Sequence, residues 1–207
     1  PRSELWWTLF DPSRAGVASG KLVRPESAAE RTPPADAFTR AALRDHEGAG
    51  VRWRLSIEPG EAPAFRFAPL AFASGLAKTR YTAAAPAALL SGEAVIGGRT
   101  LRFAAAPASV GNIFGFEGAR AWRWLHAELP GDGVLEVLSA SVPAWPFGWL
   151  TGAHLWLDGR HRRSDGLLDL AANGSSRADG LWRFEARLDG LALRGECEQD
   201  GERLARF

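Results

Sequence analysis

The sequence predicts an all-β fold: an antiparallel barrel or barrel-like sandwich of about ten or more strands, with one short helix. Two observations predict it. Asp-Gly and Gly-Gly pairs recur between short apolar runs, and such pairs supply the positive φ angles of tight hairpin turns. Helical periodicity is confined to a single segment. The turn pairs are Gly97-Gly98, Asp132-Gly133, Asp158-Gly159, Asp165-Gly166, Asp179-Gly180, Asp189-Gly190 and Asp200-Gly201.

These turns set the bounds of the expected strands. In chain order the strands are Glu4 to Phe10, Val51 to Ile57, Leu89 to Ile96, Thr100 to Ala105, Arg120 to Leu129, Val134 to Val142, Trp149 to Leu157, Leu167 to Ala171, Leu181 to Leu188 and Leu191 to Glu198. The one expected helix is Ala35 to His46, where apolar residues recur at helical spacing before a stop at Gly48. His161-Arg162-Arg163 is expected to be a solvated turn.

Length and composition indicate one globular domain over residues 1–207. Apolar residues make up 46% of the chain and charged residues 24%, which is typical of a folded protein. Because the chain contains no methionine and stops in an expected strand, we expect the native chain to extend beyond one or both ends. The bias towards Arg, Ala and Gly is typical of a GC-rich bacterium.

Charge and cysteine content narrow the function classes. The net charge of +1 gives no indication of a strongly basic surface that would bind nucleic acid. No segment approaches the ~18 consecutive apolar residues of a membrane span, and no signal peptide is visible. Cys197 is the only cysteine, so no internal disulfide can form, which fits a cytoplasmic location. The oligomeric state stays open.

The segment Arg120 to Leu129 carries the clearest functional pattern. Residues two apart in a strand share a face, so Trp122, Trp124, His126 and Glu128 line one side. Two indoles can pack in a core with the polar end at the sheet margin. Alternatively, they wall a cavity in which the imidazole and the carboxylate are the convergent polar groups of a ligand site.

The tryptophan content favours the cavity. Nine Trp residues in 207 are hard to fit in a compact core, because each indole N–H needs a partner. Glu136 lies across the expected hairpin from the His126 strand, and a one-residue choice of register decides whether it shares that face. We expect His126 to face inward, with a Trp neighbour and with Asn112 or Glu128 as its hydrogen-bond partner.

A family resemblance adds to this pattern. The run from Ser109 to His126 resembles the central block of the tocopherol cyclase-like and carotenoid 1,2-hydratase-like proteins, with its Gly and Asn residues followed by Trp-x-Trp and His. The hairpin around Gly97-Gly98 and the segments Leu135 to Ala140 and His154 to Arg160 are similar to the flanking parts of that family. The resemblance covers roughly Phe72 to Arg160.

The resemblance implies a lipocalin-like barrel around an apolar cavity, and a reaction in which an isoprenoid or polyketide-like chain is cyclised or hydrated. It places Asn112, Trp122, Trp124 and His126 at the cavity. Phe114 and Trp156 are further candidate ligand contacts. In such an enzyme His126 or Glu128 would donate or orient the proton, with Asn112 as partner.

Two other functions remain open, a non-catalytic carrier of the same apolar ligand and a structural domain with a filled core. The Walker, Rossmann and nucleophile-elbow motifs are absent from the sequence. His154, Asp158 and His161 form only a weak metal-ligand pattern. We therefore expect no metal, no cofactor and a small apolar molecule as the partner.

Overall fold

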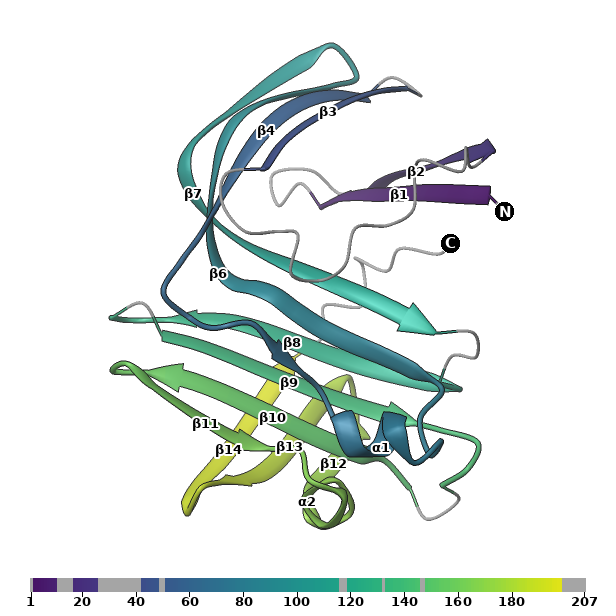
Figure 1. Cartoon of the computed structure of the whole chain (residues 1–207), viewed down its shortest axis with the longest axis vertical. Coiled ribbons are helices and arrows are strands. Elements are labelled where there is room, and N and C mark those ends of the chain that lie inside the picture. The colour runs from purple at the N-terminus through teal and green to yellow at the C-terminus, as the bar shows by residue number, and fades with distance from the viewer. Residues whose placement is uncertain are drawn as a thin grey trace. The chain divides into compact units, whose positions relative to one another are not determined.

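The computed structural model describes residues 2–10, 17–25, 42–48, 51–115, 119–131, 133–145 and 148–198. These residues form antiparallel strands and two short helices, which confirms the all-β prediction (Figure 1). In chain order the elements are β1 (Arg2–Phe10), β2 (Val17–Pro25), β3 (Ala42–Gly48), β4 (Val51–Pro59), β5 (Phe65–Arg66), α1 (Pro69–Ala73), β6 (Thr79–Ile96), β7 (Arg99–Gly115), β8 (Ala121–Leu129), β9 (Gly133–Ser141), β10 (Leu150–Leu157), β11 (Arg160–Ser164), α2 (Leu167–Ala172), β12 (Gly174–Ala178), β13 (Leu181–Leu188) and β14 (Leu191–Glu198).

The chain divides into two compact units. The first comprises Pro1–Ile57, Leu90–Ala106 and Gln199–Phe207, and the second comprises Glu58–Leu89 and Pro107–Glu198. Strands β6 and β7 are long enough to contribute one end to each unit.

In the first unit, β1 pairs with β2 in a two-stranded sheet, and β3 pairs antiparallel with β4, with Gly48 opposite Val51. The expected helix over Ala35 to His46 is therefore wrong for its last five residues, which lie in β3. Residues 35–41 lie outside the described residues. Pairing with β4 explains the difference, because a ladder of strand partners overrides a weak local preference for helix.

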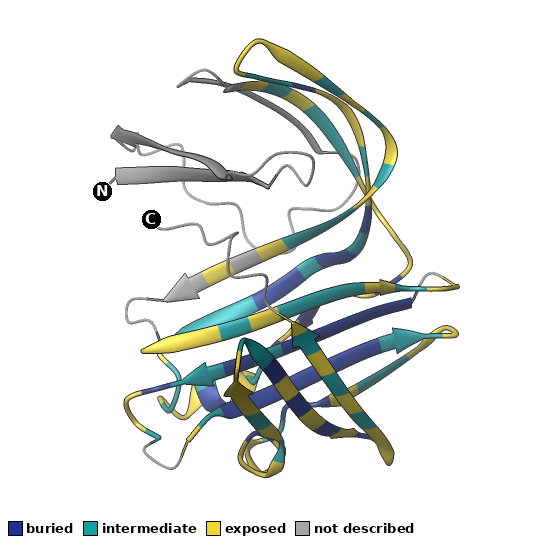
Figure 2. Ribbon diagram, turned by 180° about the vertical axis from the view of Figure 1, so that it is seen from behind, coloured by how far each residue is buried: buried dark blue, intermediate teal, exposed yellow. Residues whose placement is uncertain are grey.

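The second unit is built on a meander. Strands β8, β9, β10 and β11 pair in sequence order, and so do β12, β13 and β14. Apolar side chains of β9 and β10 pack on β13, whose residues alternate between buried and exposed from Trp182 to Leu188. The core between these two sheets consists of Leu135, Val137, Ala153, Leu155, Trp182, Phe184, Ala186 and Leu188. Strands β9 and β10 are buried along most of their length (Figure 2, dark blue).

Most of the described turn pairs behave as the sequence predicts. Both residues have positive φ in Gly97-Gly98, Asp158-Gly159, Asp179-Gly180 and Asp189-Gly190, as type I′ hairpins require. Asp165-Gly166 differs, because Gly166 has φ −64° and precedes a helix.

Two further expectations are corrected nearby. The predicted strand Leu167 to Ala171 lies in helix α2, where the Asp169 carboxylate accepts a hydrogen bond from the Gly166 N–H and caps the first turn. His161-Arg162-Arg163 is part of β11 and not a turn.

One face of the β8–β11 sheet packs on β13. The opposite face is covered by β5, α1 and the parts of β6 and β7 that belong to the second unit (Figure 1). Pairing among the described strands gives open sheets and no closed barrel. Within the described part of the chain, no helix is long and apolar enough to cross a membrane.

Candidate functional site: an apolar cavity over a buried carboxylate

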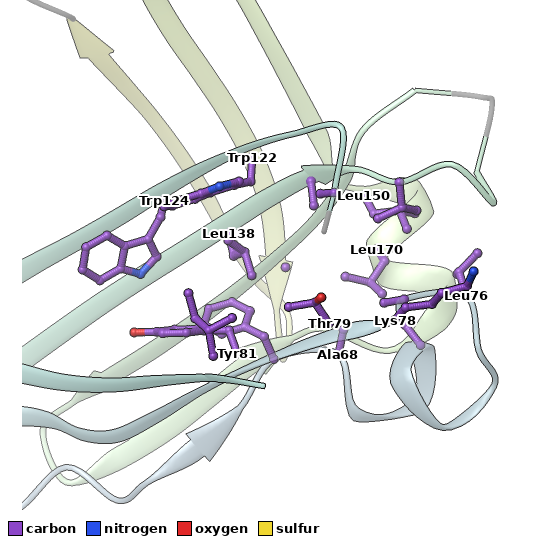
Figure 3. Close-up of a pocket in the computed structure, with 18 of the residues that line it drawn as sticks. Ala68, Leu76, Lys78, Thr79, Tyr81, Trp122, Trp124, Leu138, Leu150 and Leu170 are labelled. Carbon is purple, nitrogen blue, oxygen red and sulfur yellow. The ribbon is translucent and has the colours of Figure 1, made fainter. Parts of the chain in front are cut away.

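A cavity of about 820 Å³ lies within the second unit. Its walls come from α1 and the segment after it, from β6 and β7, from one face of β8, β9 and β10, and from α2 (Figure 3). Most of the lining side chains are apolar. The lining residues labelled in Figure 3 are Ala68, Leu76, Lys78, Thr79, Tyr81, Trp122, Trp124, Leu138, Leu150 and Leu170.

Strand register sets the neighbours of the two indoles on β9 and β10. Trp122 lies opposite Ala140 on β9, and Trp124 lies opposite Leu138. On the next strand, Gly152 lies opposite Leu138. Trp122 therefore has only a methyl group opposite it on β9, whereas Leu138 lines the cavity together with Trp124. The small residues Ala140 and Gly152 leave space on this face, and both line the cavity.

Neither indole belongs to a buried core cluster of the described residues. The exposed fraction is 60% for Trp122 and 40% for Trp124, although both line the cavity. Aromatic side chains with this much accessible surface are available to a ligand. This arrangement is the one expected of a cavity wall, not of core packing.

Beneath this wall lies a buried carboxylate, that of Glu136, whose exposed fraction is zero. The register is settled, since Glu136 lies directly opposite His126. Its Oε1 is 3.0 Å from His126 Nδ1, and its Oε2 accepts a hydrogen bond from Trp124 Nε1 at 3.4 Å. Buried carboxylates need such donors, so Glu136 holds the indole and the imidazole in place.

Tyr81 on β6 completes this group. Burial raises the pKa of its hydroxyl, and the charge of Glu136 and a hydrogen bond to Glu136 raise the pKa further. The ring lies against Gly111 on β7, where an added Cβ would stand 2.7 Å from the Tyr81 ring. Glycine at this position is therefore what allows Tyr81 to reach Glu136. Of this group, Tyr81 and Trp124 line the cavity.

The His126 imidazole has one nitrogen without a partner. Nδ1 meets Glu136, whereas Nε2 is buried and has no hydrogen bond from any described residue. When the Nδ1 proton is donated to the carboxylate, Nε2 carries the free lone pair. A carboxylate that fixes an imidazole in this way is the usual arrangement for a general base.

A second polar cluster, here called the histidine cluster, consists of Asp165, His154 and His161. His154 lies opposite Glu136 on β10 and is almost fully buried. Its Nδ1 is 3.0 Å from His161 Nε2, and its Nε2 is 3.2 Å from Asp165 Oδ2. Phe65 stacks on the His154 ring at 4.2 Å between centroids.

The histidine cluster is not arranged to bind a metal ion. His161 and Asp165 meet opposite nitrogens of the His154 ring, so the three groups do not converge on one point. Among the described residues no group of three His, Cys, Asp or Glu side chains is placed to hold a metal.

Charges around the histidine cluster favour a neutral His161 and an ionised Asp165. Burial lowers the pKa of His161, and the charges of His154 and Arg163 lower it further. The charges of Asp165 and Asp189 raise this pKa, but by less. Burial alone would raise the pKa of Asp165, but the hydrogen bond and charge of His154, the Ala68 N–H and Arg163 outweigh it and lower the pKa.

The structure brings together only some of the residues predicted from the sequence. Trp122 and Trp124 line the cavity. His126 is turned inward beside Trp124, 5.9 Å between ring centroids, but its side chain does not line the cavity, because its Nδ1 is directed to the buried Glu136. Glu128 is exposed and lies opposite Val134, so it is not the partner of His126. Trp156 is half-buried and does not line the cavity.

The side chains of Asn112 and Phe114 lie outside the described residues. The functional side chains that sequence reasoning missed are Tyr81 and Asp165. Tyr81 is the only tyrosine of the chain, a signal that could have drawn attention to it. Its contact with Glu136 joins distant strands, and no local pattern predicts such a contact.

Comparisons with known proteins give little functional information. No protein-family model and no solved structure matches the chain. Over 90 residues the chain is 34% identical to two uncharacterized proteins of Mycobacterium tuberculosis, MT0513 of strain CDC 1551 / Oshkosh and Rv0493c of strain ATCC 25618 / H37Rv. The match covers 44% of this chain and 27% of each relative, so the chain spans about a quarter of the relatives' length.

Proposed function

We propose that the second unit binds a bulky apolar small molecule in the cavity walled by Trp122 and Trp124. The observation that carries this proposal is the cavity itself. At about 820 Å³ it falls in the size range of small-molecule sites, and its lining is mainly apolar with a few polar groups. The lipocalin-like barrel and the cytoplasmic location expected from the sequence belong to the same proposal.

Tryptophan fluorescence tests this binding. Titration with N-phenyl-1-naphthylamine, an uncharged apolar probe, should quench the indole emission saturably. Phe replacements at Trp122 and Trp124 should remove most of that quenching, because these two indoles line the cavity. The matched control is Trp156→Phe, since Trp156 lies on β10 away from the lining and should leave the titration unchanged. A flat titration of the unaltered chain would refute the proposal.

A second candidate function, acid–base catalysis on the bound molecule, is favoured by the group of Tyr81, Glu136 and His126. Cyclisation or hydration of an isoprenoid or polyketide-like chain, as the family resemblance implies, would begin when a protonated His126 transfers a proton to a C=C bond and becomes neutral. The resulting carbocation would lie near Trp122 and Trp124, whose π faces stabilise cations. An internal nucleophile or water would then bond to the cation and return a proton to the neutral His126.

Product analysis distinguishes the enzyme from the carrier. Incubation with geranylgeraniol followed by mass spectrometry should give a cyclic isomer or a product heavier by one water if the chain is an enzyme. A carrier returns the probe unchanged.

Matched variants connect any such reaction to the buried carboxylate. Glu136→Gln and Tyr81→Phe should abolish turnover but leave probe binding nearly intact, because the cavity walls remain. Glu128→Gln serves as the control, because Glu128 lies on the same sheet but is exposed. Turnover that survives Glu136→Gln would exclude the catalytic role.

A further inference from the structure

Two arginines lie at the margin of the space between the two packed sheets of the second unit, on the side of β8 away from the cavity. Arg123 stands between Trp122 and Trp124 in β8, so its side chain projects to the other face of the sheet, toward β12. Arg177 lies on β12 opposite Trp182, a residue of the core between the sheets. Because residues directly opposite in a ladder share a face, Arg177 also belongs to the side of its sheet that carries this core.

The guanidinium of Arg123 is held in place by two neutral groups. Its Cζ lies 3.9 Å from the ring centroid of Trp149, and its Nη1 donates a hydrogen bond to the Ser175 hydroxyl at 3.3 Å. A guanidinium stacked on an aromatic face keeps its remaining N–H groups in its own plane, where they can meet an acceptor. The Nε and Nη2 groups of Arg123, which can bind two oxygens side by side, have no hydrogen-bond partner among the described residues.

Ser175 presents a hydroxyl proton at the same place. Its Oγ accepts one hydrogen bond from Arg123 and a second, at 3.1 Å, from Trp182 Nε1. A hydroxyl has one proton and two lone pairs, so these two bonds occupy both lone pairs and leave the O–H to donate. Within the described part of the chain no group accepts that proton. Arg177 follows two residues later on β12, so it shares the face of Ser175.

The positive charge of Arg123 is not offset by a carboxylate. Burial lowers the pKa of its guanidinium, and the charge of Arg177 lowers this pKa further. No ion pair joins Arg123 to an acidic side chain of the described residues. A half-buried cation beside a second cation costs free energy unless an anion offsets both effects. An anion bound between the two guanidinium groups would relieve the repulsion and accept the unused N–H and O–H groups.

We propose that Arg123, Ser175 and Arg177 bind a phosphate group, as the free ion or as part of a larger molecule. A phosphate group carries about two negative charges at neutral pH and has several acceptor oxygens. One such group therefore matches two guanidinium charges, the paired N–H groups of Arg123 and the Ser175 O–H. The site lies on the opposite face of β8 from the cavity, so it does not depend on the ligand binding proposed there.

NMR of the isotope-labelled full chain tests the inference through the indole N–H of Trp182, because this group donates to Ser175. Sodium phosphate at pH 7.5 should shift the Trp182 indole signal saturably, whereas sodium chloride of equal ionic strength should not. Arg123→Gln and Arg177→Gln should each weaken phosphate binding about tenfold, because each removes a charge-assisted contact. The matched control is Arg183→Gln on β13, since Arg183 is exposed and has its own partner, Glu196. This variant should bind phosphate like the unaltered chain.

A parallel titration with glycerol phosphate separates the two sources of the phosphate group. Tighter binding than that of inorganic phosphate assigns the site to a phosphorylated molecule, and weaker binding assigns it to the free ion. The proposal is overturned if chloride shifts the Trp182 signal as far as phosphate does, or if both Arg123→Gln and Arg177→Gln keep full phosphate affinity. Circular dichroism identifies variants that fail to fold. Because Arg177 is exposed, Arg177→Gln remains informative if Arg123→Gln does not fold.

Discussion

Replacing Glu136 with Leu tests whether this carboxylate organises the floor of the site. The substitution removes the acceptor of Trp124, His126 and Tyr81 and leaves an apolar side chain in its place. Trp124 is 40% exposed, so its indole N–H can turn to water at little cost. The His126 imidazole N–H and the Tyr81 hydroxyl lie deeper, and both would lose the Glu136 carboxylate as their hydrogen-bond acceptor.

The magnitude follows from those two donors. A buried donor without a partner costs roughly 1–3 kcal/mol, so we expect the loss of two partners in Glu136→Leu to lower the free energy of unfolding by about 2–6 kcal/mol. Glu136→Gln keeps one acceptor oxygen and should cost only ~1–2 kcal/mol. Losses of this size are a large fraction of the stability of a typical domain.

Urea unfolding followed by far-UV circular dichroism measures both losses. The control is Glu185→Leu on β13, because Glu185 is exposed and its ion pair with Arg194 lies at the surface. That change should stay within ~0.5 kcal/mol. If Glu136→Leu proves as stable as the unaltered chain, the assignment of Glu136 as the common acceptor is wrong.

Three further predictions concern the cavity, the core and the pH dependence. Gly111→Ala should displace the Tyr81 ring and weaken probe binding at least severalfold in a fluorescence titration, because the new Cβ would overlap the ring; unchanged affinity would contradict it. Leu188→Ala, at a side chain with zero exposure between the two sheets, should cost about 2–5 kcal/mol in urea unfolding, and a loss below ~1 kcal/mol would show that the core is loosely packed. The depressed pKa of His161 means that the unfolded chain binds its proton more readily, so the free energy of unfolding should fall as pH drops below His161's ordinary value of 6.5. His161→Gln should reduce that slope, measured by unfolding at pH 7.5 and pH 5.5, and an unchanged slope would assign the effect to other groups.

Turn chemistry explains why the strands of the second unit could be predicted. Asp179-Gly180 and Asp189-Gly190 adopt positive φ at both residues, so a dipeptide was enough to identify each hairpin. The same reasoning failed at Asp165-Gly166. There the following Leu-Leu-Asp-Leu-Ala-Ala run has a high helix propensity and its own cap at Asp169, and these outweigh the turn signal.

The candidate site was predictable only along a single strand. Alternation placed Trp122, Trp124 and His126 on one face, because a strand has a strict period of two. It could not choose between Glu128 and Glu136 as the partner of His126, since that choice depends on register. Contacts between distant segments had no local signature, and Tyr81 with Glu136 is the clearest case.

The order of strand pairing has a consequence for how the chain folds. From β8 to β14 each paired neighbour is also the next strand in the sequence, so these sheets need only short loops to close and should form early. The cavity wall is different, because the Ala68 N–H meets Asp165 across 97 residues of chain. The wall should therefore assemble last and open first. Hydrogen exchange should report this order, with the amides of β9 and β10 protected long after those of α1 have exchanged.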